Sequence, residues 1–465
     1  MQHPLLHLFA ATLMSLGAAS DSGANTAPQP PDSSTPPPRS MTQAGAPGTG
    51  KHPQTIPQSA EVMALARGNN HFACDLYAQL RNEKGNLFFS PFSISTILAM
   101  TAAGARGETQ ASMVKALRPP FHDARWHEAG GALLAHLEAV QQTNGVKLSI
   151  ANSLWPNLDF QPTETFLAIA EKKYRAKVTP LDYGNDEPSA RATINNWVLQ
   201  GTGGKITNIL ANPLSRDTRL ILINAIHFKG DWAVPFRASQ TRTEPFHLAN
   251  GQSTPTPFMH LRERIFHARI GETGKSTPNT PADAGTSPPA PVPAAALVKL
   301  PYSGRNLSML VLLPEENTPA ALSALENALS AENLEAWHTQ ARQQEVILAF
   351  PKFKIESGTM LLARPLASLG MGSAFTPAAD FHGISAKEGL FIGDALHKAF
   401  VEVNETGTEA AAATVVGIRA TSIGAKPLKP VEFRADHPFL FLIMDDATRS
   451  ILFIGRFSTP PQHRD

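Results

Sequence analysis

Residues 398–423, KAFVEVNETGTEAAAATVVGIRATSI, decide how this chain is organised, and they form two segments joined by a glycine. Residues 399–403 alternate and carry β-branched valines, which is typical of a β-strand. Residues 404–407 have the composition of a turn and predict the end of that strand. The run 408–414 consists almost entirely of small side chains, which by local propensity fits an alanine-rich short helix or a flexible linker.

The small-residue run also has a period of two. Its alternate residues are all suited to lie against a core, and they are Thr408, Ala410, Ala412, Thr414, Val416 and Ile418. The other set contains both charged side chains, Glu409 and Arg419. Because successive side chains of a strand point to opposite faces, the same stretch can also become a β-strand. A loop able to become a strand indicates a function that depends on a conformational change.

Residues 401–414 resemble the hinge of the reactive-centre loop of the serpins, a family of serine protease inhibitors. The resemblance implies an α+β fold with three β-sheets, about eight to nine helices and an exposed reactive-centre loop over about residues 405–432. It also implies which residues form the hinge, namely Glu405, Gly407, Thr408, Glu409, Ala410, Ala411, Ala412 and Ala413.

Composition limits the class of protein. The chain has 465 residues, a formal net charge of +1 and 17% charged residues, so nothing indicates a nucleic-acid partner. The single cysteine, Cys74, excludes an internal disulfide framework and lies in an apolar helical pattern, which favours a buried, inert thiol.

The sequence predicts four regions. Residues 1–20 resemble a secretory signal peptide of a bacterial protein, so we expect the protein to be secreted to the extracellular space or the periplasm. Residues 21–57 are rich in Pro, Ser, Gly and Thr and predict a disordered linker. Residues 58–460 form the domain that resembles a serpin, interrupted by a Pro-rich insertion at residues 272–296.

Within that domain, strands and helices mix without a regular βαβ period, which by itself indicates an α+β fold. Helices are predicted at residues 59–80, 91–105, 110–117, 162–174, 192–200, 322–329 and 361–369. Strands are predicted at residues 87–89, 146–155, 220–228, 346–353, 433–443 and 451–457, with a hairpin over residues 297–313.

Further motifs resemble serpins in the same order along the chain. Residues 86–94 match the motif Asn-x-x-x-Ser-Pro-x-Ser-Ile, and residues 351–356 again look like the family. By local rules Ser90 simply caps a helix, and Asn224 in a buried strand needs a partner for its amide. The resemblance instead implies a shutter beneath the central sheet, formed by Ser90, Ser93, Asn224 and His397, with Trp232 at the breach where the loop begins to insert. His397 is expected just before the strand at residues 399–403.

Known catalytic motifs are absent. The sequence has no Gly-x-Ser-x-Gly, no His-Glu-x-x-His and no Cys/His cluster with metal-ligand spacing, so we expect no catalytic residues, no metal and no enzyme activity. The resemblance implies a monomer without cofactor or membrane association, whose partner is a serine, or by extension cysteine, endopeptidase held as a covalent acyl-enzyme. The alternative is a non-inhibitory member of the family that acts as a carrier, chaperone or storage protein.

The bond offered to the protease has two candidates. Sixteen residues after Glu405, the usual spacing in the family, stands Thr421, which makes Thr421–Ser422 the expected bond and suits an elastase- or subtilisin-like pocket. A shorter spacing would place Arg419–Ala420 there and suit a trypsin-like protease.

Overall fold

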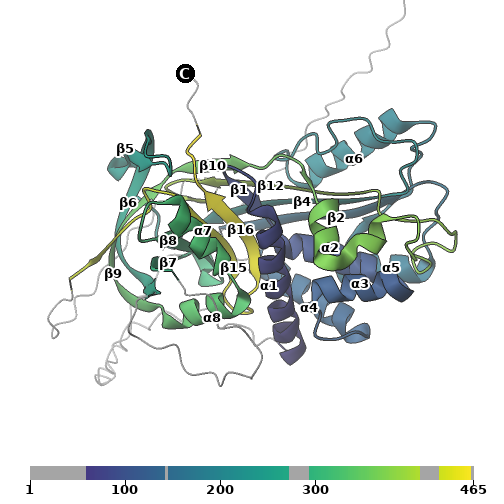
Figure 1. Cartoon of the computed structure of the whole chain (residues 1–465), viewed down its shortest axis with the longest axis horizontal. Helices are drawn as coiled ribbons and strands as arrows, with labels where there is room; N and C mark the ends of the chain where they lie inside the picture. Colours follow the sequence, from purple (N-terminus) through teal and green to yellow (C-terminus); the bar gives the residue numbers. More distant parts are fainter. Residues whose placement is uncertain (1–58, 142–144, 272–292, 409–428, 462–465) are drawn as a thin grey trace, which may run out of the picture. The chain divides into compact units, whose positions relative to one another are not determined.

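The computed structural model describes residues 59–141, 145–271, 293–408 and 429–461 (Figure 1). The expected signal peptide and linker, most of the insertion, the hinge from Glu409 onward and both candidate bonds lie outside these residues.

The predicted helices are present, and polar side chains cap several of them. Ser59 accepts the backbone N–H of Val62 at the start of α1, and Ser90 accepts that of Ser93 before Pro91 opens α2. The α-helices are α1 Ala60–Leu80, α2 Pro91–Ala103, α3 Gly107–Leu117, α4 Ala124–Gln141, α5 Glu164–Tyr174, α6 Glu187–Gly201, α7 Pro319–Asn327, α8 Ala331–Gln340 and α9 Ala363–Leu366. None of the helices in the described ranges is long and apolar enough to cross a bilayer.

One sheet of the described chain has seven strands, in the order β10-β12-β13-β4-β2-β3, with β11 paired to β12. Their bounds are β2 Val146–Pro156, β3 Lys177–Val178, β4 Leu220–Asp231, β10 Phe353–Glu356, β11 Met360–Leu361, β12 Asp394–Val403 and β13 Gly407–Thr408.

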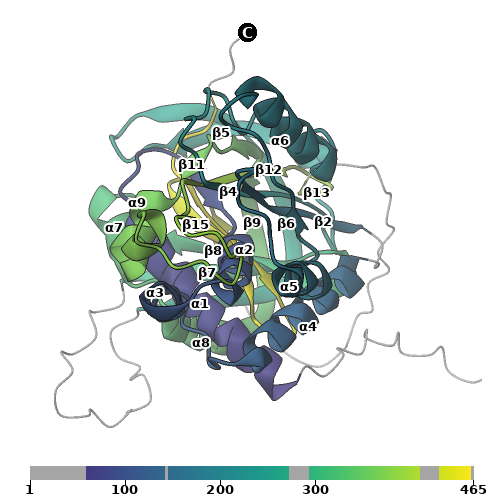
Figure 2. The same ribbon diagram turned by 90° about the vertical axis from the view of Figure 1, so that its right-hand side faces the viewer.

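Both faces of this sheet are covered, as the continuous apolar run of β4 predicts. Leu222 and Ile226 of β4 belong to the main core, to which α2 contributes, whereas Ile221 and Ile223 pack with Ile194 of α6. In Figures 1 and 2, α6 lies on one side of the sheet and α2 on the other. Nearly every residue of α2 is buried, so this helix has no solvent face.

The second sheet has nine strands in the described chain, in the order β1-β16-β15-β8-β7-β6-β9-β14, with β5 paired to β6. Their bounds are β1 Leu87–Phe89, β5 Arg242–His247, β6 Ser253–Ile270, β7 Ala295–Pro301, β8 Leu307–Pro314, β9 Arg342–Pro351, β14 Val431–Arg434, β15 Phe439–Asp445 and β16 Ile451–Phe457. The three sheets implied by the resemblance are thus two hydrogen-bonded sheets here, because the long β6 pairs with β5 at its start, with β9 along its middle and with β7 at its end.

Several boundaries differ from the prediction. The strand expected at residues 433–443 is two strands, because Pro438 lacks a backbone N–H and the chain changes partners from β9 to β8 and β16 around it. The helix expected at 361–369 starts at Ala363 and is an α-helix only to Leu366, where it continues as a π-helical turn; the chain leaves the helical conformation at Gly370, whose φ is 101°. Strand β7 begins at Ala295, so the last two residues of the predicted insertion belong to it.

Two helices and two longer strands are among the elements that were not predicted. The patterns of α4 and α8 are weakened by a Gly-Gly pair and by many polar residues, respectively. Strand β6 contains two prolines and β5 one, and proline is normally evidence against a strand.

Candidate functional site

The seven-stranded sheet is split at one end between β4 and β12. The two strands are parallel neighbours from Asp394 opposite Ile221 to Phe400 opposite His227. Beyond that point the two residues of β13 lie between them, with Thr408 opposite both Val403 of β12 and Gly230 of β4. The exposed loop that was expected from about residue 405 therefore does not include Gly407 and Thr408, which are buried strand residues.

Gly407 is the position where only glycine fits. A Cβ atom added to it would lie 2.1 Å from the carbonyl oxygen of Gly230 and 2.5 Å from Cα of Asp231. Both obstacles are backbone atoms of β4, so no rotamer change relieves the clash. The hinge glycine is thus explained by the close approach of two backbones rather than by a positive φ.

A tight turn leads the chain from β12 into β13. The side-chain oxygen Oδ1 of Asn404 accepts the backbone N–H of Thr406 at 3.1 Å and that of Gly407 at 3.3 Å, which is an Asx turn. The hydroxyl of Thr406 donates to the same oxygen at 2.9 Å. The turn composition of residues 404–407 therefore does end β12, as predicted.

Trp232 connects this turn to the rest of the sheet end, where the resemblance places the breach. Its indole Nε1–H donates to the carbonyl oxygen of Asn404 at 3.0 Å, and its backbone N–H donates to that of Thr406 at 2.8 Å. The indole stacks on the ring of Tyr302 with centroids 4.7 Å apart. The hydroxyl groups of Tyr302 and Thr408 lie 2.8 Å apart and form a buried hydrogen bond. Tyr302 was missed in the sequence, because a tyrosine in a predicted hairpin turn carries no signal of such a role.

Glu405 is held by two partners that are distant in the sequence, Lys352 between β9 and β10 and Thr241 just before β5. The ammonium group of Lys352 lies 2.9 Å from its carboxylate, and the hydroxyl of Thr241 donates to it at 2.7 Å. Burial opposes ionisation of this carboxyl, but the hydrogen bonds from Lys352 and Thr241 outweigh it and hold the pKa of Glu405 below its usual value. The backbone carbonyl of Glu405 also accepts the N–H of Phe236 at 2.8 Å.

The four residues of the expected shutter do come together beneath the closed part of the sheet. Asn224 stands opposite His397 on β12 and opposite Asn152 on β2. Its amide Nδ2 donates to the hydroxyl of Ser93 and to Oδ1 of Asn152. Asn152 was missed, although an asparagine within a buried strand is a signal that could have found it. His397 lies inside β12 rather than before it, because β12 starts at Asp394.

The hydrogen bonds of His397 fix its protonation state. Nε2 accepts the backbone N–H of Ser90 at 3.1 Å, so this nitrogen carries no proton, and Nδ1–H donates to Oδ1 of Asn224. The ring is fully buried, and burial lowers its pKa to about 3. A neutral imidazole thus links α2 to the two strands that flank the split.

The chemistry of this site is conformational. Among the residues that the structure describes, no group of three or more His, Cys, Asp or Glu side chains could hold a metal ion. The only cysteine, Cys74, is buried, and burial raises the pKa of its thiol to about 12, so it is a poor nucleophile. What the site offers is a sheet that accepts a strand: β13 is in place, and the chain that follows it begins at Glu409.

Comparisons with known proteins agree with this geometry. A family model described as "Serpin (serine protease inhibitor)" matches residues 67–460. The chain is 36% identical over 403 residues to the leukocyte elastase inhibitor of Xenopus laevis, covering 85% of this chain and 99% of that protein. It is 37% identical over 392 residues to an uncharacterized serpin-like protein of Thermococcus kodakarensis, covering 84% of each. Among solved structures, human thyroxine-binding globulin complexed with thyroxine superposes with a TM-score of 0.73 at 29% identity, over 87% of this chain and 100% of that one.

Proposed function

Because this chain belongs to the serpin family, we propose that it is an irreversible suicide-substrate inhibitor of a serine endopeptidase, or by extension a cysteine endopeptidase. The protease attacks the reactive-centre loop and forms an acyl-enzyme. Cleavage frees the segment that follows Thr408, which inserts between β12 and β4 and carries the attached protease with it. Distortion of the protease then prevents hydrolysis of the acyl bond.

The observation that supports this proposal most strongly is the split itself. Thr408 already pairs with both flanking strands and Gly407 pairs with β4, so insertion can extend a strand that is already in place. The residues after Thr408 have only to separate β12 from β4 along their direct pairing. The small side chains at Ala410 and Ala412 suit an entry between strands that are already packed together.

The driving force for insertion has a plausible size. About a dozen new strand residues, at a net ~1 kcal/mol for each hydrogen bond, give a free energy on the order of 10 kcal/mol before side-chain burial is counted. That is comparable to the whole stability of an ordinary domain, about 5–15 kcal/mol. Insertion is therefore favourable enough to be irreversible in practice.

The proposal includes a target class and a location. Thr421–Ser422 is the proposed reactive bond, with an elastase- or subtilisin-like target, which agrees with the name of the relative from Xenopus laevis. The signal-like residues 1–20 would deliver the protein to the extracellular space or the periplasm.

The test is incubation of the protein with elastase-, subtilisin- and trypsin-like proteases, followed by denaturing electrophoresis. The expected result is a complex stable in SDS with at least one protease, and a released C-terminal fragment that begins at Ser422 by mass spectrometry. A fragment that begins at Ala420 would assign the bond to Arg419–Ala420 instead. Cleavage without complex by every protease would overturn the inhibitor proposal.

A pair of matched variants makes the test specific to insertion. By the period of two, Ala412 is in the set that faces the core and Ala411 is in the other set. Ala412→Arg should convert the inhibitor into a substrate, because an inward arginine stalls entry. Ala411→Arg should still form the complex.

The second candidate is a non-inhibitory serpin that acts as a carrier, chaperone or storage protein. One observation favours it, namely that thyroxine-binding globulin in complex with its ligand is among the similar structures. The two candidates differ after cleavage. An inhibitor gains strongly in thermal stability when the loop is cut, whereas a member without insertion keeps its melting temperature.

A further inference from the structure

The seam between β4 and β12, where the two strands pair directly, ends at one particular pair of residues. It runs from Asp394 opposite Ile221 to Phe400 opposite His227. Beyond Phe400 the place between the two strands is taken by β13, whose Thr408 pairs with both of them. A strand that extends β13 therefore separates Phe400 from His227 before any other pair of the seam.

The side chains of this last pair contact each other across the seam. Their ring centroids lie 5.9 Å apart, within the usual distance for aromatic pairs, and both side chains are almost fully buried. Because side chains alternate along a strand, Phe400 faces the same side of β12 as Leu396, which packs with Ile194 of α6. The contact between Phe400 and His227 thus lies on the face of the sheet that α6 covers.

The chain that connects α6 to β4 crosses the seam on this face. Its Ile206 belongs to the same part of the core as Ile223 of β4 and Leu396 of β12. The ammonium group of Lys398 on β12 donates to the carbonyl oxygen of Thr207 in this connection at 3.3 Å. The connection is therefore in contact with both strands of the seam.

Two lysines from separate segments reach the ring of Phe400. Lys205 belongs to the connection from α6, and its Nζ lies 5.6 Å from the ring centroid. Lys354 belongs to β10, and its Nζ lies 5.1 Å from the same centroid. An ammonium group within about 6 Å of an aromatic ring is attracted by it, more strongly where water is partly excluded. Lys205 is half-buried and Lys354 is exposed, so we expect Lys205 to make the stronger contact.

We propose that Lys205 and Lys354 form a clamp on Phe400, which holds the seam closed at the pair that opens first. Separation of β12 from β4 takes Phe400 away from the place where the connection from α6 holds Lys205 over its ring. The attraction between ammonium group and ring is lost on opening, so it stabilises the closed seam. The consequence for the protease, slower entry of the cleaved segment, rests on the proposed inhibitory function, whereas the opening of the seam does not.

The experiment is hydrogen exchange of the full-length protein and of its Lys205→Gln variant, followed by mass spectrometry of fragments. The fragment that covers residues 394–400 should exchange about three- to tenfold faster in the variant, as expected when one partly buried cation–π contact no longer opposes local opening. No acceleration of this fragment overturns the proposal.

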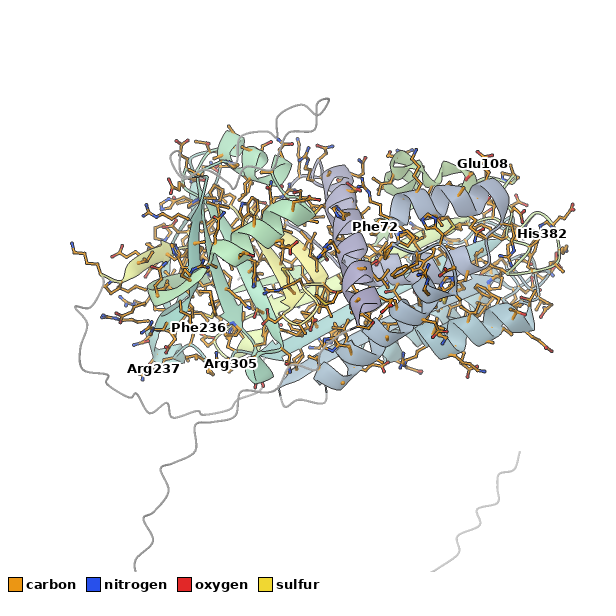
Figure 3. The ribbon with its side chains drawn as sticks, turned by 90° about the horizontal axis from the view of Figure 1, so that it is seen from below. Phe72, Glu108, Phe236, Arg237, Arg305 and His382 are labelled. Carbon is orange, nitrogen blue, oxygen red and sulfur yellow. The ribbon has the colours of Figure 1, made fainter. Side chains whose placement is uncertain are left out.

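Two fragments serve as internal controls, and their exchange should not change. One covers β15, a fully buried strand of the other sheet. The other covers α3, whose Glu108 lies on the opposite side of the molecule from Phe236 in Figure 3. Phe236 is next to the split, because its backbone N–H donates to the carbonyl oxygen of Glu405. Equal acceleration in all three fragments would indicate a general loss of stability and also overturns the proposal.

Further variants test whether the positive charge acts on the seam. Lys205→Arg should exchange like the parent protein, because a guanidinium group is also attracted by an aromatic ring. Lys147→Gln is the matched control. Lys147 is exposed on the same face of β2 as Ser149, which is opposite His227, but it does not lie over the ring of Phe400. Acceleration in Lys147→Gln as large as in Lys205→Gln counts against the clamp.

A double-mutant cycle assigns the effect to the ring. Phe400→Leu keeps an apolar side chain at the seam but removes the aromatic face. In this background Lys205→Gln should cause no further acceleration, because the partner of the ammonium group is already gone. Acceleration as large as in the parent protein would show that Lys205 acts through another contact.

The outcome is separable from that of the inhibitor assay. Exchange is measured on the protein alone, so a protein that forms no complex with any protease can still show the clamp. Conversely, a protein that forms the complex but whose seam does not respond to Lys205→Gln contradicts the clamp and leaves the proposed function intact.

Discussion

The hydroxyl groups of Tyr302 and Thr408 lie 2.8 Å apart in a fully buried hydrogen bond that joins the hinge to the turn between β7 and β8. Tyr302 also stacks on Trp232, so one side chain touches both the inserted residue and the residue that holds the turn before it. The loop in this state is thus tied to the sheet by side-chain contacts as well as by backbone pairing.

This bond predicts a specific pattern in a double-mutant cycle. Thr408→Val leaves the Tyr302 hydroxyl buried without a partner and should lower the free energy of unfolding by about 1–3 kcal/mol. Tyr302→Phe alone leaves the smaller Thr408 hydroxyl unpaired. The double variant should lose less free energy of unfolding than the two single variants together, because both polar groups are then removed. Urea denaturation measures all four proteins, and strictly additive losses would show that the two hydroxyls are not coupled.

The backbone contact at Gly407 predicts that an alanine at this position lowers the stability of the protein. Gly407→Ala places a methyl group 2.1 Å from the carbonyl oxygen of Gly230, so β13 should leave its place between β12 and β4. We expect faster hydrogen exchange at Trp232, whose backbone N–H donates to the carbonyl of Thr406, and a lower melting temperature. Gly358→Ala is the matched control, since its added methyl group would meet nothing within 4 Å, and it should leave both measurements unchanged.

The neutral state of His397 predicts how stability depends on pH. The pKa is lowered to about 3 in the folded protein from 6.5 in the unfolded chain, so folding favours the unprotonated ring. The contribution of the neutral His397 ring to the free energy of unfolding is fully present above pH 6.5. As the pH falls toward 3, the unfolded chain binds a proton that the folded protein does not, and the free energy of unfolding decreases by up to about 1.4 kcal/mol for each pH unit.

Nuclear magnetic resonance of the histidine rings tests this prediction directly. The His397 signal should stay at its neutral position from pH 8 to pH 4, and a midpoint near 6.5 would contradict it. Burial also lowers the pKa of His338 to about 3. The dependence of the free energy of unfolding on pH should therefore be measured in a His338→Gln background, where His338 no longer adds to the effect of His397.

The ion pair of Glu405 with Lys352 predicts a weaker anchor for the turn when either charge is removed. Glu405→Gln should lower the free energy of unfolding by about 1 kcal/mol, the upper part of the range for a pair that still has some contact with water. Because the pKa of Glu405 is lowered in the folded protein, this contribution is present above about pH 4.5 and is lost as the pH falls.

The matched test is Lys352→Met, which should not lower the free energy of unfolding further in a Glu405→Gln background. If the two substitutions are fully additive in urea denaturation, the pair does not stabilise the turn. Thr241, which also donates to Glu405, stays in place in all of these variants.

The sequence by itself predicted the end of β12, the turn before Gly407 and most of the elements that surround them. Alternation in residues 399–403, the Asx-type turn composition and Pro91 after Ser90 act over a few neighbouring residues, so local rules detect them. The gathering of Ser90, Ser93, Asn224 and His397 was available only through the resemblance to serpins, since these residues lie far apart in the sequence.

Tertiary structure alone decided where β13 begins and which residues surround it. Thr408 belongs to a strand because β4 and β12 separate beyond Phe400 and leave unpaired backbone groups that it satisfies. Tyr302 and Lys352 act through contacts with residues distant in sequence, which no local pattern records, and the buried-strand position of Asn152 indicates that its amide needs a partner but not that the partner is Asn224. The same small-residue run fits a loop or a strand by propensity, and the choice between them depends on whether two neighbouring strands provide partners for its backbone.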